Sequence, residues 1–187
     1  CCLPNFIVMA PSSGEELKNM INFALSINNK PCAIRYPRDL AHEYKDNNKF
    51  QKILIGKGKV IKNGKKIAFL NLGTRLKKVL EISELIKKNY KLDCTIIDMR
   101  FAKPIDVKLI QKLTKNHDIF ITIEENAIGG FSSQVNDFLI NKISNTPKIL
   151  NFFMKDEFID QSDIEDQYSK SGISPKIIYE KLIKFLK

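Results

Sequence analysis

The chain has 187 residues, of which 43% are hydrophobic, and a formal net charge of +10 at pH 7. This is enough for one complete domain and part of a second. No run of about 18 apolar residues occurs, which argues against a membrane-spanning helix. The four cysteines and two histidines form no zinc-ligand pattern, so we expect no metal site.

The positive charge comes from lysines that are scattered singly or in pairs, such as Lys65-Lys66 and Lys87-Lys88. A nucleic-acid-binding segment usually concentrates its like charges in one block. The scattered pattern favours a solvated lysine-rich surface, and we expect neither nucleic acid nor membrane as a partner. A basic module that binds RNA or an acidic protein is the alternative. The excess of Lys, Asn and Ile over Arg, Gly and Ala is typical of an AT-rich genome.

The first predicted unit is strand, helix and strand over residues 6–35. Residues 6–9 are all apolar, as in a buried parallel strand. Ser12 or Ser13 then provides a helix N-cap, with glutamates three residues later, and apolar residues follow at helical spacing. Residues 32–34 form a second short strand.

Residues 39–52 are polar and aperiodic, which predicts a linker. A strand over 53–61 follows and ends at an Asn63-Gly64 turn. The remaining strands and helices alternate with short loops. The predicted strands are 67–72, 94–99, 119–123 and 149–153, and the predicted helices are 75–89, about 106–115, 132–142, 162–170 and 174–186. This order predicts an α/β fold, with a mostly parallel sheet covered by helices on both faces.

Ligands of such folds bind at the carboxyl ends of the strands. Gly73-Thr74 and Gly129-Gly130 each lie between a strand and a helix. They match neither a P-loop nor a dinucleotide-binding motif, so we interpret them as tight turns. For Glu124-Glu125 we favour a structural role, either capping the next helix or pairing with Arg100. Neither His42 nor His117 supports a catalytic dyad.

The stretch I-R-Y-P-R-D, residues 34–39, follows the last strand of the first unit and carries Arg35 and Arg38. A guanidinium group matches the geometry of a phosphate or carboxylate with two parallel hydrogen bonds. The proline at position 37 fixes the backbone between them. An ion pair with Asp39 or Glu43 is the structural alternative, and local chemistry favours it over phosphate binding.

Several stretches occur in a familiar order and spacing. They are L-P-N-F-I-V-M-A-P-S-S-G-E-E-L (3–17), A-I-R-Y-P-R (33–38), L-N-L-G-T (70–74), D-M-R-F-A-K-P-I-D (98–106), T-I-E-E-N-A-I-G-G-F (122–131) and E-F-I-D-Q (157–161). Over nearly its whole length the chain resembles the carboxyl-terminal part of the 1-deoxy-D-xylulose-5-phosphate synthase family, thiamine-diphosphate-dependent transferases of the transketolase superfamily.

The resemblance implies that residues 1–45 end a pyrimidine-binding domain and that residues 46–187 form a transketolase C-terminal domain. The family's reaction condenses pyruvate with glyceraldehyde 3-phosphate and releases CO2. It is the first step of the non-mevalonate isoprenoid pathway, and its product also feeds thiamine biosynthesis. The resemblance further implies a homodimer that uses thiamine diphosphate and Mg²⁺.

Within the resemblance, Arg38 aligns with the family residue that holds the phosphate of glyceraldehyde 3-phosphate, and Arg35 is structural or secondary. Asp39 departs from the glycine that the family usually has there. The family's catalytic, cofactor-binding and metal-binding residues precede the segment that starts at Cys1. We therefore expect that this chain is a piece of a longer protein, and that alone it is inactive and binds neither cofactor nor metal.

Two related families share the C-terminal domain fold and are alternatives: transketolase and the β subunit of a 2-oxo-acid dehydrogenase. A purely structural assembly domain is a third. The loop E-E-N-A-I-G-G-F is one residue shorter than in many bacterial members, which favours a plastid or apicoplast location in an AT-rich parasite. The cytoplasm of an AT-rich bacterium is the alternative.

Overall fold

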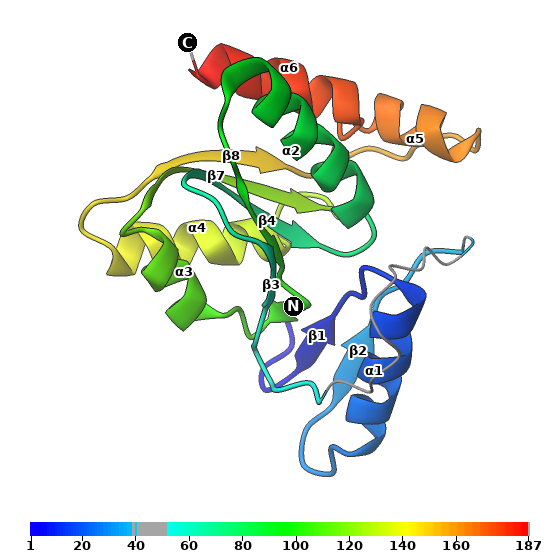
Figure 1. The fold of residues 1–187 in the computed structure, drawn as a ribbon. Helices are drawn as coiled ribbons and strands as arrows, with labels where there is room; N and C mark the ends of the chain where they lie inside the picture. The colour runs from blue at the N-terminus through cyan, green and yellow to red at the C-terminus, as the bar shows by residue number, and fades with distance from the viewer. Residues whose placement is uncertain (39, 41–51, 187) are drawn as a thin grey trace.

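The computed structural model describes residues 1–38, 40 and 52–186. Figure 1 shows the course of the chain. The strands are β1 (Ile7–Met9), β2 (Cys32–Ile34), β3 (Lys59–Lys62), β4 (Lys66–Leu72), β5 (Thr95–Asp98), β6 (Phe101–Lys103), β7 (His117–Glu124) and β8 (Lys148–Phe152). The helices are α1 (Gly14–Leu25), α2 (Leu76–Tyr90), α3 (Val107–Leu113), α4 (Phe131–Lys142), α5 (Ile164–Lys170) and α6 (Pro175–Leu186).

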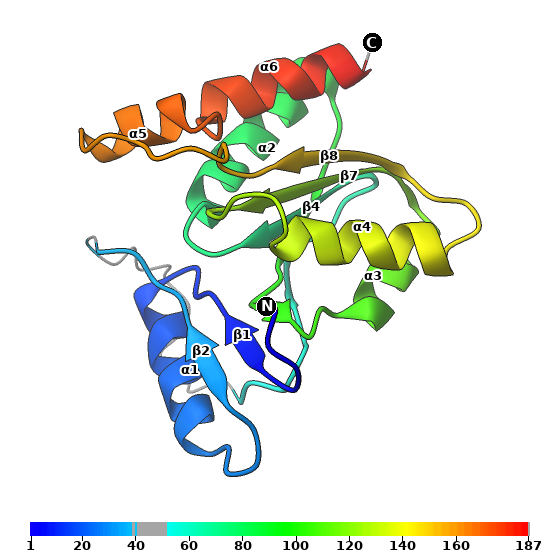
Figure 2. The same cartoon turned by 180° about the vertical axis from the view of Figure 1, so that it is seen from behind.

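The larger sheet has five strands in the order β3-β5-β4-β7-β8. Strands β5, β4, β7 and β8 are parallel, whereas β3 runs antiparallel to β5 at the edge. Helices α2 and α6 cover one face, and α3 and α4 cover the other, as both views show (Figures 1 and 2). The predicted α/β fold with a mostly parallel sheet is confirmed.

The two faces of this sheet are both apolar, because parallel strands between helix layers are buried on each side. Along β4, Phe69 packs in the cluster that includes residues of α2 and α6, while its neighbour Leu70 packs in the cluster that includes residues of α3 and α4. This alternation with a period of two fixes which side chains face which layer.

The predicted strand–helix–strand unit is confirmed as β1, α1 and β2, with β1 and β2 parallel. The Ser13 hydroxyl accepts a hydrogen bond of 3.2 Å from the backbone N–H of Glu16 and so caps α1. Met20 of α1 is fully buried in a cluster with Met9 and Phe101. The hydrophobic core of this strand–helix–strand unit therefore includes Phe101, which lies far from it in the sequence.

Phe101 belongs to β6, a strand that the sequence did not predict. Strand β6 pairs antiparallel with β1 and thereby joins the first unit to the rest of the chain (Figure 1). Met99 and Arg100 separate β5 from β6, and Arg100 has a left-handed backbone with φ 59°. A strand of three residues is too short to show the alternation of apolar and polar residues that predicts a strand. The left-handed residue before it also interrupts the extended backbone. For these reasons β6 was not predicted.

The predicted strand over 53–61 is wrong in its first part and in length. Only Lys59–Lys62 is a strand, and it pairs with β5 rather than with the strand that follows it. The preceding Gly56 has φ 65° and packs against Pro104. The backbone N–H of Gly58 donates to the Asp106 carboxylate at 3.2 Å. These glycines form a turn against the start of α3 and lie outside the strand. Most of the predicted linker lies outside the described residues.

Candidate functional site

A cavity of about 400 Å³ opens where β1, β2 and β4 end. Its wall comes from four parts of the chain: the start of α1, the segment after β2, the start of α2, and α5. The lining residues are Pro11, Ser12, Ser13, Gly14, Leu17, Tyr36, Pro37, Arg38, Leu40, Thr74, Arg75, Lys77, Lys78, Ile164, Glu165 and Tyr168. This is the edge of the sheet at which α/β folds bind ligands.

Arg38 lines this cavity with an exposed side chain. Its predicted role in phosphate binding is compatible with that place but is not tested by it. The alternative ion pairs, to Asp39 and Glu43, lie outside the described residues. The structure adds that other cations lie on the same wall. Among its described residues, this wall carries the cationic side chains of Arg75, Lys77 and Lys78 and a single carboxylate, that of Glu165.

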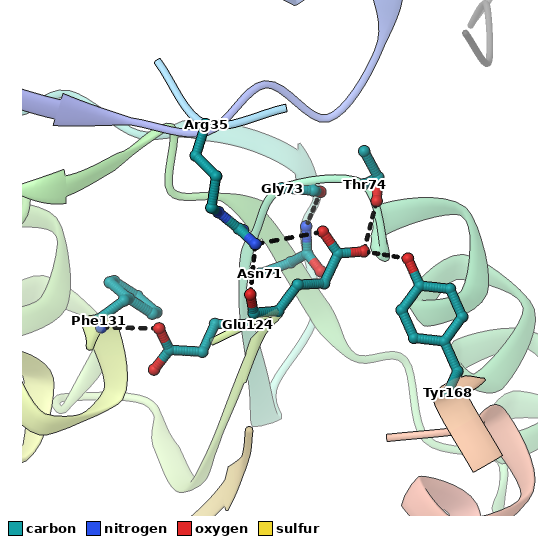
Figure 3. Close-up of polar contacts among 8 residues, drawn as sticks. Arg35, Asn71, Gly73, Thr74, Glu124, Phe131 and Tyr168 are labelled. Carbon is teal, nitrogen blue, oxygen red and sulfur yellow. Dashed lines mark hydrogen bonds and ion pairs between the residues drawn. The ribbon is translucent and has the colours of Figure 1, made fainter. Parts of the chain in front are cut away.

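Arg35 has a different environment, although only three residues separate it from Arg38. Its Nη1 donates to the backbone carbonyl of Glu125 at 2.5 Å and lies 3.5 Å from the Glu125 carboxylate (Figure 3). Arg35 thus ties the end of β2 to the end of β7, which is the structural role expected for it.

The Glu125 carboxylate collects contacts from three other segments. It accepts hydrogen bonds of 2.6 Å from the Thr74 hydroxyl and 2.6 Å from the Tyr168 hydroxyl, in addition to the ion pair with Arg35 (Figure 3). Burial and the Glu125 charge together raise the pKa of Tyr168 to about 12, so the phenol keeps its proton and donates it. Glu125 therefore links the ends of β2 and β4 to α5, and both of its carboxylate oxygens have partners.

Glu124 caps helix α4. Its carboxylate accepts from the backbone N–H groups of Phe131 and Ser132 at 2.9 and 2.8 Å and from the Ser132 hydroxyl at 2.7 Å. A Cβ at Gly130 would overlap this carboxylate, so the turn requires glycine there. The expected capping role is confirmed for Glu124, whereas a pair between these glutamates and Arg100 is wrong.

Arg100 pairs instead with Glu16 of α1, with Nη2 to Oε1 at 2.5 Å. Beside this pair, the Asp98 carboxylate accepts hydrogen bonds from the Ser12 hydroxyl at 2.5 Å and from the backbone N–H of Arg100 at 3.1 Å. Burial raises the pKa of Asp98 to about 7, and the hydrogen bond from Ser12 opposes that shift. This buried cluster sits behind the cavity, since Ser12 belongs to both.

Arg75 is the residue of this wall that sequence reasoning missed. It is the N-cap residue of α2, is only 4% exposed, and lies over the ring of Tyr168 at 3.7 Å. Its Nε and Nη2 have no hydrogen-bond partner among the described residues. A charged residue directly before an amphipathic helix was the only local signal, and it is an ambiguous one, because such residues are usually exposed.

The remaining candidates have structural surroundings. His117 begins β7, and its ring nitrogens lie 2.7 Å from the Thr95 hydroxyl and 2.9 Å from the Leu113 carbonyl. His42 lies outside the described residues. Cys94 is a free buried thiol, and burial raises its pKa to about 11. No helix in the described part of the chain is long and apolar enough to cross a membrane.

The cavity does not fit thiamine diphosphate with its Mg²⁺. Magnesium needs oxygen ligands such as carboxylates, and the described residues of this wall provide one carboxylate and four cationic side chains. Within residues 1–38, 40 and 52–186, no group of three or more His, Cys, Asp or Glu could hold a metal ion. The cationic wall suits an anion without a metal.

The fold and the position of this cavity define an α/β domain of the transketolase type. The chain belongs to the transketolase C-terminal domain family, whose model matches residues 56–178. Among curated relatives, it is 38% identical over 183 residues to 1-deoxy-D-xylulose-5-phosphate synthase of Psychromonas ingrahamii, which covers 95% of this chain and 28% of that protein.

A plant relative is equally similar. The chain is 38% identical over 178 residues to the chloroplastic 1-deoxy-D-xylulose-5-phosphate synthase 1 of Cannabis sativa, covering 93% of this chain and 25% of that protein. The chain therefore spans about a quarter of the length of these synthases and is homologous to their C-terminal part.

Solved structures agree on the fold. A split-gene transketolase described as an inactive β4 tetramer superposes with a TM-score of 0.88 at 24% identity, over 98% of this chain and 58% of that one. A transketolase of Pichia stipitis superposes with a TM-score of 0.72 at 12% identity, over 98% of this chain and 25% of that one. At these identities the likeness supports the fold alone.

Proposed function

We propose that this chain is the carboxyl-terminal part of a 1-deoxy-D-xylulose-5-phosphate synthase. The enzyme is a thiamine-diphosphate-dependent transferase that condenses pyruvate with glyceraldehyde 3-phosphate and releases CO2. The observation that carries the proposal is the placement of Arg38 on a cationic cavity at the carboxyl ends of β1, β2 and β4. The similarity to synthases over nearly the whole chain supports it against transketolase and the dehydrogenase β subunit.

Within this proposal the chain contributes to acceptor binding and to assembly. Residues 1–45 complete a pyrimidine-binding domain, and residues 46–187 form the C-terminal domain. Thiamine diphosphate supplies the carbanion chemistry of the reaction when it is bound with Mg²⁺ by other parts of the protein. The chain alone is therefore inactive, and the active form is a homodimer.

The role of Arg38 is to bind the acceptor through its phosphate. A guanidinium group donates two parallel hydrogen bonds to a phosphate, which fixes both the position and the orientation of the ligand. Orientation matters because the carbonyl carbon at the other end of the acceptor must reach the reacting carbon of the donor. We place the protein in a plastid or apicoplast stroma, with the bacterial cytoplasm as the alternative, since both bacterial and chloroplastic relatives occur.

The test compares wild type with Arg38→Ala in the longest natural form of the protein. Condensation of pyruvate is measured with glyceraldehyde 3-phosphate and with unphosphorylated glyceraldehyde. A hydrogen bond to a charged group contributes about 1.5–3 kcal/mol, so kcat/KM for the phosphorylated acceptor should fall at least about 10-fold. The value for glyceraldehyde should hardly change.

Lys115→Ala is the matched control, because it removes an exposed cation that does not line the cavity. It should leave both acceptors unaffected. If Arg38→Ala weakens both acceptors equally, or neither, Arg38 is a structural residue and its assignment to the phosphate is wrong.

A further inference from the structure

Arg75 carries a buried positive charge that the proposed function does not use. Its side chain is 4% exposed, and its Nε and Nη2 find no hydrogen-bond acceptor in the part of the chain that the structure describes. The guanidinium carbon lies over the face of the Tyr168 ring, 3.7 Å from the ring centroid. Burying an ionised group without a partner of opposite charge is costly. An anion that accepted hydrogen bonds from these nitrogens would compensate the charge.

The surroundings of Arg75 leave this charge without compensation. Glu165, the one carboxylate among the described residues that line the cavity, lies 3.8 Å from Lys78, which also pairs with Glu81 at 3.5 Å. The nearby Glu125 carboxylate is occupied by Thr74, Tyr168 and Arg35. Both acidic groups that the described residues place at the cavity, Glu165 and Glu125, thus have other partners, whereas Arg38, Lys77 and Arg75 line it.

Tyr168 positions the guanidinium of Arg75 for recognition of an oxyanion. A guanidinium group stacked on an aromatic ring keeps its N–H groups directed outward in its own plane. The hydrogen bond from the Tyr168 hydroxyl to Glu125 holds the ring in place. The first turn of α2 adds backbone N–H groups, because Arg75 provides no side-chain cap for this helix.

We propose that Arg75 binds a phosphate monoester in this cavity together with Arg38, and that it determines specificity for a phosphorylated acceptor. The part that concerns the acceptor rests on the proposed function. A phosphate carries close to two negative charges and three acceptor oxygens, so it can satisfy both guanidinium groups and Lys77 at once. A single carboxylate would leave one of the guanidinium groups unpaired.

The key variant is Arg75→Met, examined in the longest natural form of the protein with its cofactors. Methionine retains a long flexible side chain and a favourable contact with the Tyr168 ring while it removes the charge. Binding of inorganic phosphate is measured by titration calorimetry, and thermal midpoints are measured in phosphate and in chloride at equal ionic strength. Lys115→Met is the matched control for the loss of one positive charge.

We expect wild type and Lys115→Met to bind phosphate and to melt at a higher temperature in it. Arg75→Met should bind phosphate at least about 30-fold more weakly. In chloride it should melt at or above the wild-type midpoint, because the buried unpaired charge is gone. Its kcat/KM should fall for glyceraldehyde 3-phosphate and not for glyceraldehyde. Arg75→Lys, which keeps the charge without the planar fork, should lose part of the phosphate affinity.

The opposite pattern would overturn the proposal. If Arg75→Met melts well below wild type in chloride and still binds phosphate normally, Arg75 is a structural residue. If phosphate binding is lost but the two acceptors are affected equally, the cavity takes free phosphate and the assignment to the acceptor falls. If Arg38→Ala discriminates between the acceptors and neither Arg75 variant does, the proposed function stands while the role of Arg75 is wrong.

The outcomes also separate this inference from the proposed function. If wild type does not condense pyruvate with glyceraldehyde 3-phosphate, the proposed function fails. The phosphate titration of wild type and Arg75→Met then decides by itself whether Arg75 binds an anion.

Discussion

Asp98 is the residue whose ionisation should affect stability most clearly. Its carboxyl group is 1% exposed, and burial raises its pKa from 3.8 to about 7. The unfolded chain releases this proton near pH 4, whereas the folded protein keeps it until about pH 7. Between these values the folded state binds more protons, so the contribution to stability is present at low pH and is lost as the pH rises.

We predict that the unfolding free energy of wild type falls relative to that of Asp98→Asn between pH 4 and pH 7, by at most roughly 4 kcal/mol. Above pH 7 the difference should level off. Denaturant unfolding of both proteins across this range measures it, and the comparison cancels the titration of other carboxylates. A difference that is flat with pH, or that grows in favour of wild type, would contradict a raised pKa.

At the scale of elements, the join between β7 and α4 depends on one carboxylate. Glu124 ends β7 and accepts hydrogen bonds from the N–H groups of Phe131 and Ser132, the first two residues of α4. A carboxylate can accept at both oxygens, and its charge is favourable at a helix N-terminus. Glutamine in its place would turn an amide N–H₂ group toward one of these donors.

Glu124→Gln should therefore destabilise the protein by about 1–3 kcal/mol, the usual cost of a buried donor left unpaired. Asp118→Asn is the control on the same strand, because Asp118 is exposed and should change stability little. Chemical denaturation gives both values, and hydrogen exchange should rise first in the opening turn of α4. Equal stability of the two variants would show that the capping bonds contribute nothing.

Strands and helices with a clear local pattern of apolar residues were predicted correctly, and those without one were missed. The apolar runs of β4 and β7 and the amphipathic pattern of α2 were sufficient to predict the layered fold. Strand β6 and the pairing of β3 depend on contacts between distant segments and have no periodic signal of their own. Gly56 was predicted to lie in a strand because its turn depends on a contact with Pro104, which is distant in the sequence.

The same distinction separates the two arginines of the cavity. Arg38 was identified through a family resemblance in a short motif, and the structure places it on the cavity wall. Arg75 was missed because its burial is created by Tyr168 of α5, which lies far along the chain. The residues around position 75 do not predict the contact with Tyr168, because that contact depends on packing between distant elements.

At the scale of the whole molecule, the chain has the fold of a C-terminal domain together with a small unit attached through β6 (Figure 1). It spans only about a quarter of the synthases that it resembles. The similarity therefore identifies the C-terminal part of such a protein, and activity has to be measured on the longer protein.

The most direct measurement follows CO2 release from carboxyl-labelled pyruvate by the longest natural form of the protein. Each of two acceptors, glyceraldehyde 3-phosphate and ribose 5-phosphate, is added in turn. A 1-deoxy-D-xylulose-5-phosphate synthase releases CO2 in step with product formation and prefers the three-carbon phosphorylated aldehyde. No release from pyruvate, together with transfer of a two-carbon unit from a ketose phosphate to ribose 5-phosphate, would contradict the synthase assignment and indicate a transketolase.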